Sequence, residues 1–153
     1  MERSPKWFRG ALVYLTVSFA IVGFWATLHP KGFYDGFPGA GRRWITGDGP
    51  YNAHLATDAG VGFLAVGAVL LLATVWMDRR VVEVALIAVI VHGTPHLIFH
   101  LVHPNDALET VDSLASNGSL ALGTVLAVVL LLSVNRSVPS EPQRTTTANE
   151  RTN

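Results

Sequence analysis

The sequence contains no cysteine, and this absence excludes three kinds of chemistry. A disulfide framework, a thiolate metal site and a cysteine nucleophile all require a residue that the chain does not have. The absence leaves the redox compartment open, because many proteins of every compartment lack cysteine.

Charge is also scarce. Only 14% of the 153 residues are charged, against roughly a quarter in an ordinary soluble domain. Eleven basic residues balance eleven acidic ones, so the composition indicates no nucleic-acid partner. Lysine is rare beside arginine, while Ala, Val and Gly are abundant, a bias typical of GC-rich bacterial genomes. A chain of this length suffices for one domain.

Long apolar runs are what the sequence does have, and four of them reach the roughly 20 residues needed to cross a bilayer. They cover about residues 10–28, 53–76, 81–103 and 112–134. Stretches such as Gly62–Val75 and Leu120–Leu132 are apolar all round, whereas helices of a soluble bundle alternate polar and apolar faces. The pattern predicts an all-α, multi-pass membrane protein built as a four-helix transmembrane bundle.

Basic residues beside the spans predict the orientation. On one side, Arg3, Lys6 and Arg9 precede the first span, Arg79 and Arg80 lie between the second and third, and Arg136 follows the fourth. On the other side, the first loop has Lys31, Arg42 and Arg43, and residues 104–112 contain no basic residue. By the positive-inside rule both termini face the cytoplasm, which gives an N-in/C-in protein of the cell membrane. Residues 135–153 are polar and Thr-rich, which predicts a disordered cytoplasmic tail.

The connection between the first and second spans, residues 29–52, is the longest. It contains six glycines and three prolines, yet also five aromatic residues. Because so many aromatic side chains are not expected to stay loose in water, we expect a structured outer loop. Loops of this length are often functional, although an ordered connector with interfacial anchors is an equal alternative.

Histidines provide the clearest functional signal. His92, His96, His100 and His103 fall on one stripe of the third span, roughly 80° wide at the helical period. His54 and Asp58 share a face at the start of the second span. Antiparallel spans would bring both sets to the outer leaflet, and ionisable residues inside a bilayer usually face the bundle interior for a functional reason.

These residues predict a transition-metal site formed by His54, Asp58, His96 and His100, with His103 as a fifth ligand or proton shuttle. Zinc, iron and copper all suit such ligands. Two alternatives stay open. In the first, the residues form only local polar contacts between helices. In the second, a haem lies between His54 and a histidine of the third span.

Three motifs carry a resemblance to a known group. They are Phe37-Pro38-Gly39, the Pro50–Gly60 stretch and the Pro-His-x-x-x-His-x-x-His pattern of residues 95–103. Over residues 10–134 the chain resembles small four-helix integral membrane proteins of bacteria, with a build similar to DoxX-like proteins. The resemblance implies a membrane bundle and, because some DoxX-like proteins serve quinone-linked oxidation, a redox role.

Two main functions are compatible with the sequence. One is a membrane metal or redox protein that acts on a lipid-like or quinone-like molecule, and the other is a non-catalytic accessory or assembly subunit of a larger membrane complex. The second predicts a membrane-protein partner or a homo-oligomer. A path for protons or ions through His92 is a third alternative. The sequence leaves open whether the protein is an enzyme.

Overall fold

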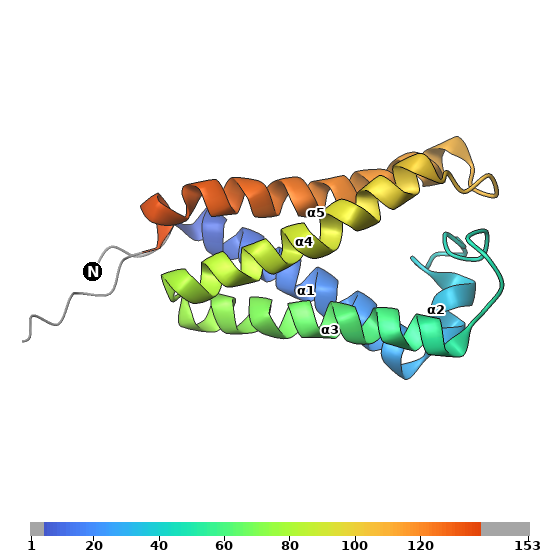
Figure 1. The fold of residues 1–153 in the computed structure, drawn as a ribbon, viewed down its shortest axis with the longest axis horizontal. Coiled ribbons are helices and arrows are strands. Elements are labelled where there is room, and N and C mark those ends of the chain that lie inside the picture. The colour runs from blue at the N-terminus through green and yellow to red at the C-terminus, as the bar shows by residue number, and fades with distance from the viewer. Residues whose placement is uncertain (1–4, 139–153) are drawn as a thin grey trace, which may run out of the picture.

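A computed structural model describes residues 5–138, and every regular element in that range is an α-helix. Four helices are long and one is short (Figure 1). Their bounds are α1 Lys6–Leu28, α2 Pro30–Gly36, α3 Ala53–Trp76, α4 Arg79–Val102 and α5 Thr110–Ser137. The long helices begin and end within a few residues of the predicted spans, so the all-α, four-helix expectation is confirmed.

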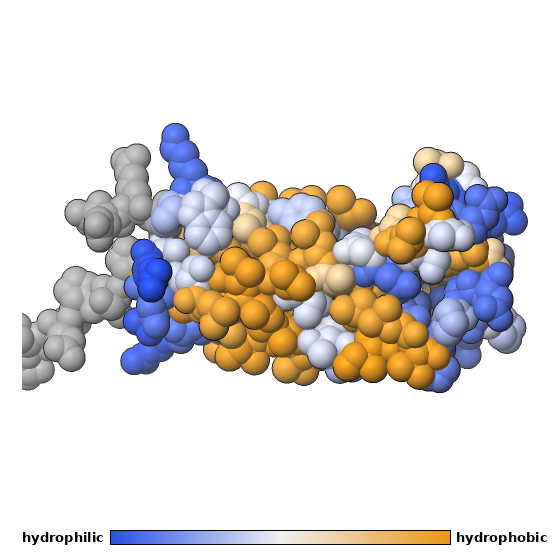
Figure 2. Space-filling model, turned by 90° about the horizontal axis from the view of Figure 1, so that it is seen from above, coloured by the Kyte–Doolittle hydropathy of each residue, from blue (hydrophilic) through white to orange (hydrophobic). Residues whose placement is uncertain are grey.

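The four long helices are each long and apolar enough to cross a membrane, and the chain is a multi-pass membrane protein. Large apolar side chains lie on the outside of the bundle, such as Leu28 at 74% and Leu132 at 78% exposure. Figure 2 shows them as a hydrophobic belt between two hydrophilic ends. Contact of these apolar side chains with lipid tails is favourable, whereas their exposure to water would cost free energy.

The sequence predicted a disordered tail from residue 135, but α5 continues through residue 137. The prediction is therefore wrong for residues 135–137. Polar residues 135–137 can be helical because the backbone hydrogen bonds of a helix continue past the apolar part of a span. The rest of the predicted tail, residues 139–153, lies outside the described residues.

Short polar residues determine where two of the long helices begin. The side chain of Asn52 accepts a hydrogen bond from Leu55 N, at 3.0 Å, and so caps α3. Asp78 caps α4 in the same way through Val81 N, at 3.0 Å. Between α3 and α4 only Met77 and Asp78 are non-helical, and Met77 adopts the left-handed conformation that ends a helix. The tight turn makes α3 and α4 antiparallel neighbours.

The helices associate as two pairs, α1 with α3 and α4 with α5. Glycine permits the close approach within the first pair. A Cβ on Gly60 would lie 2.6 Å from Thr27 N, and one on Gly23 would lie 2.9 Å from Leu64 N. Thr16 and Thr74 add a hydrogen bond between the same helices, with 3.0 Å between their hydroxyl oxygens. Small residues and hydroxyls are the usual means of packing helices in lipid.

The two pairs pack tightly at one end and separate toward the other (Figure 1). We call the end with Lys6, Asp78 and Ser137 the terminal end, and the end with residues 29–52 and 103–109 the loop end. Buried apolar residues from all four long helices form one core that extends from the terminal end to about mid-bundle. This core comprises Phe8, Leu12, Leu15, Phe19, Leu70, Ala73, Val82, Ala85, Leu86, Val89, Ala127, Leu130, Val134 and Val138.

The connection of residues 29–52 folds over the loop end. It contains α2 and an aromatic cluster in which Phe37 contacts three rings: Trp25 at 6.1 Å, Phe33 at 5.0 Å and Trp44 at 5.8 Å between centroids. The Tyr34 hydroxyl donates to Gly49 O at 2.6 Å. These contacts give the connection a defined shape despite its glycine and proline content.

Candidate functional site

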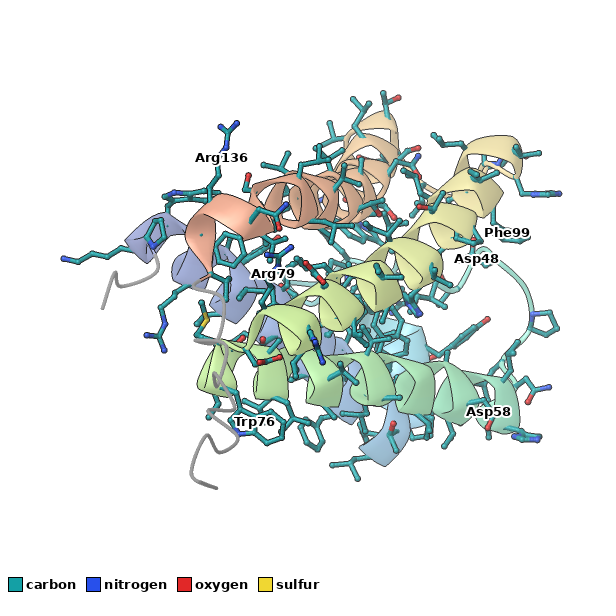
Figure 3. All side chains as sticks on the ribbon, turned by 60° about the vertical axis from the view of Figure 1, so that its left-hand side comes forward. Asp48, Asp58, Trp76, Arg79, Phe99 and Arg136 are labelled. Atoms are coloured by element: carbon teal, nitrogen blue, oxygen red, sulfur yellow. The ribbon has the colours of Figure 1, made fainter. Side chains whose placement is uncertain are left out.

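The structure divides the histidines and acids of the loop end into separate groups. His54 and Asp58 form one pair on α3, with 3.1 Å between Nδ1 and Oδ2. Both side chains are open, at 84% and 61% exposure. Figure 3 shows Asp58 on α3, well apart from Asp48 and Phe99 on the α4 side of the loop end. The pair is therefore a local contact of α3.

A second pair lies on α4, one helical turn apart. The Nε2 atoms of His96 and His100 face each other at 3.1 Å, and both side chains are partly buried. The spacing of four residues places the rings on one face of the helix, as the stripe predicted. Two nitrogens at this separation can share a proton, and they can also share an ion.

Further along α4, the imidazoles continue as a row. His92 lies 5.9 Å from His96 between ring centroids, and His96 lies 5.0 Å from His100. His103 leaves the row, because its ring stacks on Phe99 at 4.6 Å and its Nδ1 is 3.2 Å from the carbonyl oxygen of Phe99. The end of α4 at Val102 frees His103 from the helical stripe.

The predicted grouping of His54, Asp58, His96, His100 and His103 is not assembled. Within residues 5–138 no three histidine, aspartate or glutamate side chains lie close enough to hold one metal ion. The separation of the two helix pairs toward the loop end provides the physical reason, since α3 and α4 are adjacent at their turn but carry these residues at their far ends. Of the five residues, the structure brings together His54 with Asp58, and His96 with His100.

Asp48 is the residue near this pair that the sequence did not reveal. It belongs to the 29–52 connection and lies close enough to His100 for their charges to interact. Asn105 donates a hydrogen bond to the Asp48 carboxylate at 3.0 Å and another to Trp44 O at 3.1 Å. A Cβ on Gly47 would clash with the Asn105 amide, so glycine there leaves room for this contact. In the sequence, the one hint of this contact is Asn105 in the 103–109 turn, whose side-chain amide can donate to a carboxylate.

A second acid, Asp112, lies in the first turn of α5. Its carboxylate pairs with Arg42 of the 29–52 connection. An Arg–carboxylate pair at the first turn of α5 is favourable both electrostatically and for the helix dipole. Together with Asn105, this ion pair attaches the connection to the α4–α5 pair across the open loop end.

The environment of Asp48 predicts that the stability of the folded protein depends on pH. Partial burial raises the pKa of Asp48 above 3.8, and His100 and the Asn105 hydrogen bond oppose that rise without cancelling it. The folded state therefore holds its proton more tightly than the unfolded state does. The contribution of Asp48 to stability is complete below pH 3.8 and is lost as the pH rises through the folded-state pKa.

Asparagine does not titrate, so the Asp48→Asn variant should not lose stability as Asp48 loses its proton. We therefore expect the wild-type protein to become less stable relative to the variant as the pH increases. Unfolding in detergent between about pH 3 and pH 7 measures the difference. Asp106→Asn is the matched control, because Asp106 lies exposed in the 103–109 turn. A difference that is constant with pH, or that has the opposite sign, would contradict the assignment.

Comparisons with known protein families, with curated proteins and with solved structures find no match to this chain. Its function is therefore inferred from the residues and geometry described above.

Proposed function

We propose that this membrane protein binds a transition-metal ion through His96 and His100 at its loop end, which we assign to the extracytoplasmic side of the cell membrane. The observation that carries the proposal is the 3.1 Å separation of the two Nε2 atoms. In tetrahedral zinc sites the metal–nitrogen distance is about 2.0–2.1 Å, which places two ligand nitrogens roughly 3.3 Å apart. Little movement is needed for both rings to bind one ion.

Two protein ligands leave coordination positions open, and reactive zinc sites likewise keep one position open beside three protein ligands. Asp48 interacts electrostatically with His100, and it lies on the 29–52 connection, where a small shift would let it complete or orient the site. Water or a small molecule fills what remains. Zinc, iron and copper are the candidates, because each accepts imidazole and carboxylate together.

The other predicted residues have lesser roles in this proposal. His54 and Asp58 form a polar pair at the exposed start of α3, and His103 lies at the surface, where it can exchange protons with water. Redox chemistry on a lipid-like or quinone-like molecule remains part of the proposal only for iron or copper, since zinc has no accessible second oxidation state.

Elemental analysis with an optical spectrum on gently purified protein tests the proposal. We expect one zinc, iron or copper ion per chain, and no haem absorption band. Folded protein that is metal-free, and that takes up no added Zn²⁺ or Cu²⁺, would contradict the proposal. It would favour the accessory-subunit alternative, which needs no ion.

A further inference from the structure

A cavity of about 130 Å³ lies inside the bundle at the level where the two helix pairs begin to separate. All four long helices contribute to its wall. It lies directly beyond the apolar core, with Phe19 and Val89 belonging to both.

Two kinds of surface line the cavity. Phe19 and Phe63 form an aromatic corner with His92, whose ring centroid is 5.4 Å from Phe19 and 4.6 Å from Phe63. Ser119 and Thr124 of α5 donate their hydroxyl hydrogens to carbonyl oxygens of their own helix, at 2.8 and 3.0 Å. Each hydroxyl oxygen keeps acceptor capacity for another group.

Among the residues that line the cavity, His92 has a buried polar atom without a hydrogen-bond partner. Its Nε2 atom is buried and has no partner within residues 5–138. A buried nitrogen of this kind costs free energy unless something pairs with it. Rotation of the ring by 180° exchanges each nitrogen with a carbon position, so His92 can offer a nitrogen to the cavity that it lines.

We infer that this cavity binds a small aromatic molecule that carries one hydrogen-bonding group, such as a phenol. Binding there is separate from metal binding, although His96 borders both sites. The ring would pack against the Phe19–Phe63 corner, and the hydroxyl group would pair with His92. The binding step forms no covalent bond.

Size and access agree with this ligand class. An apolar cavity of about 150 Å³ in another protein holds one benzene molecule, so the volume here suits a single ring. Ser119 lines the cavity and is also exposed, and the apolar side chains of Leu114 and Leu122 on the same helix are exposed as well. The molecule therefore enters sideways from the bilayer, where small phenols concentrate.

The test uses 4-fluorophenol as the probe, with ¹⁹F NMR on the full chain in detergent. We expect a saturable signal from wild-type protein above the linear partitioning into micelles. Gly123 lines the cavity, and a Cβ there would meet nothing within 4 Å, so the Gly123→Val side chain starts in open space and takes up part of the cavity volume. We expect this variant to bind at least roughly tenfold more weakly.

Gly118→Val is the matched control. Gly118 lies on the same helix, also has no atom within 4 Å of an added Cβ, and does not line the cavity. Its binding should equal that of the wild type. Absence of a saturable signal in wild-type protein means that the cavity holds only water, and equal binding by wild type and Gly123→Val places the probe elsewhere; both results overturn the inference.

His92→Phe separates the two parts of the interaction. Loss of one hydrogen bond should weaken 4-fluorophenol binding by about two- to tenfold, while binding of fluorobenzene should stay unchanged. If both probes respond equally, His92 does not recognise the polar group, and the ligand class is wrong. Metal content measured on the same samples distinguishes this failure from failure of the His96–His100 site.

Discussion

The His100→Ala variant is expected to lose its high-affinity metal ion. His96 and His100 provide both protein nitrogens of the proposed site, so the substitution removes one of the two nitrogen ligands in one step. Removal of an outer-shell partner alone typically weakens metal binding by about 10- to 100-fold, so loss of a ligand should weaken it by at least roughly 100-fold. Competition titration with Zn²⁺, and EPR of the Cu²⁺ form, measure the affinity and the nitrogen ligands.

Two control variants make this result specific. His103 lies on the same stretch of chain but stacks on Phe99, so His103→Ala should change the affinity little. His54→Ala tests the larger site predicted from the sequence. Unchanged binding in His54→Ala supports the two-histidine site, and a loss similar to that of His100→Ala would show that α3 contributes a ligand after all.

The Gly60→Ala variant is expected to destabilise the bundle strongly, although it adds only one methyl group. The new Cβ would lie 2.5 Å from the Thr27 hydroxyl oxygen and 2.6 Å from the Thr27 backbone nitrogen. Because backbone cannot move aside as a side chain can, α1 and α3 must separate. We expect a loss of about 2–3 kcal/mol in the free energy of unfolding, toward the upper end for overpacked sites.

Gly62→Ala is the matched control for this prediction. Gly62 follows Gly60 closely on α3, and a Cβ there would meet nothing within 4 Å. Alanine favours helix over glycine by up to about 1 kcal/mol, so this variant should be neutral or slightly more stable. Unfolding of both variants in mixed micelles provides the comparison. Equal stabilities would mean that α1 and α3 do not approach closely at Gly60.

The helical framework could be predicted well from the sequence. Membrane spans are detected by length and apolar composition, which are properties of a continuous segment, and the helix-capping residues Asn52 and Asp78 are close to the ends of those segments. The His96–His100 pair was predictable for the same reason. A spacing of four residues on one helix brings two side chains together whatever the rest of the chain does.

The larger site was less predictable, because it required that two helix ends meet. An antiparallel order places His54 and His100 at the same depth, but it does not determine the distance between α3 and α4 at that depth. The core that pulls the four helices together ends at about mid-bundle, so the pairs separate where the histidines lie. Asp48 was missed for a related reason, since its place depends on a long connection held by Asn105.

The sequence by itself determined that the chain forms four membrane-length helices and that His96 and His100 share a face, because both follow from local composition and helical period. The tertiary structure alone decided that His54 and Asp58 stay apart from them, that Asp48 comes near and that a cavity opens beside His92. These depend on where the packed core ends and how the helix pairs diverge, and such distances are set by contacts between segments far apart in the chain.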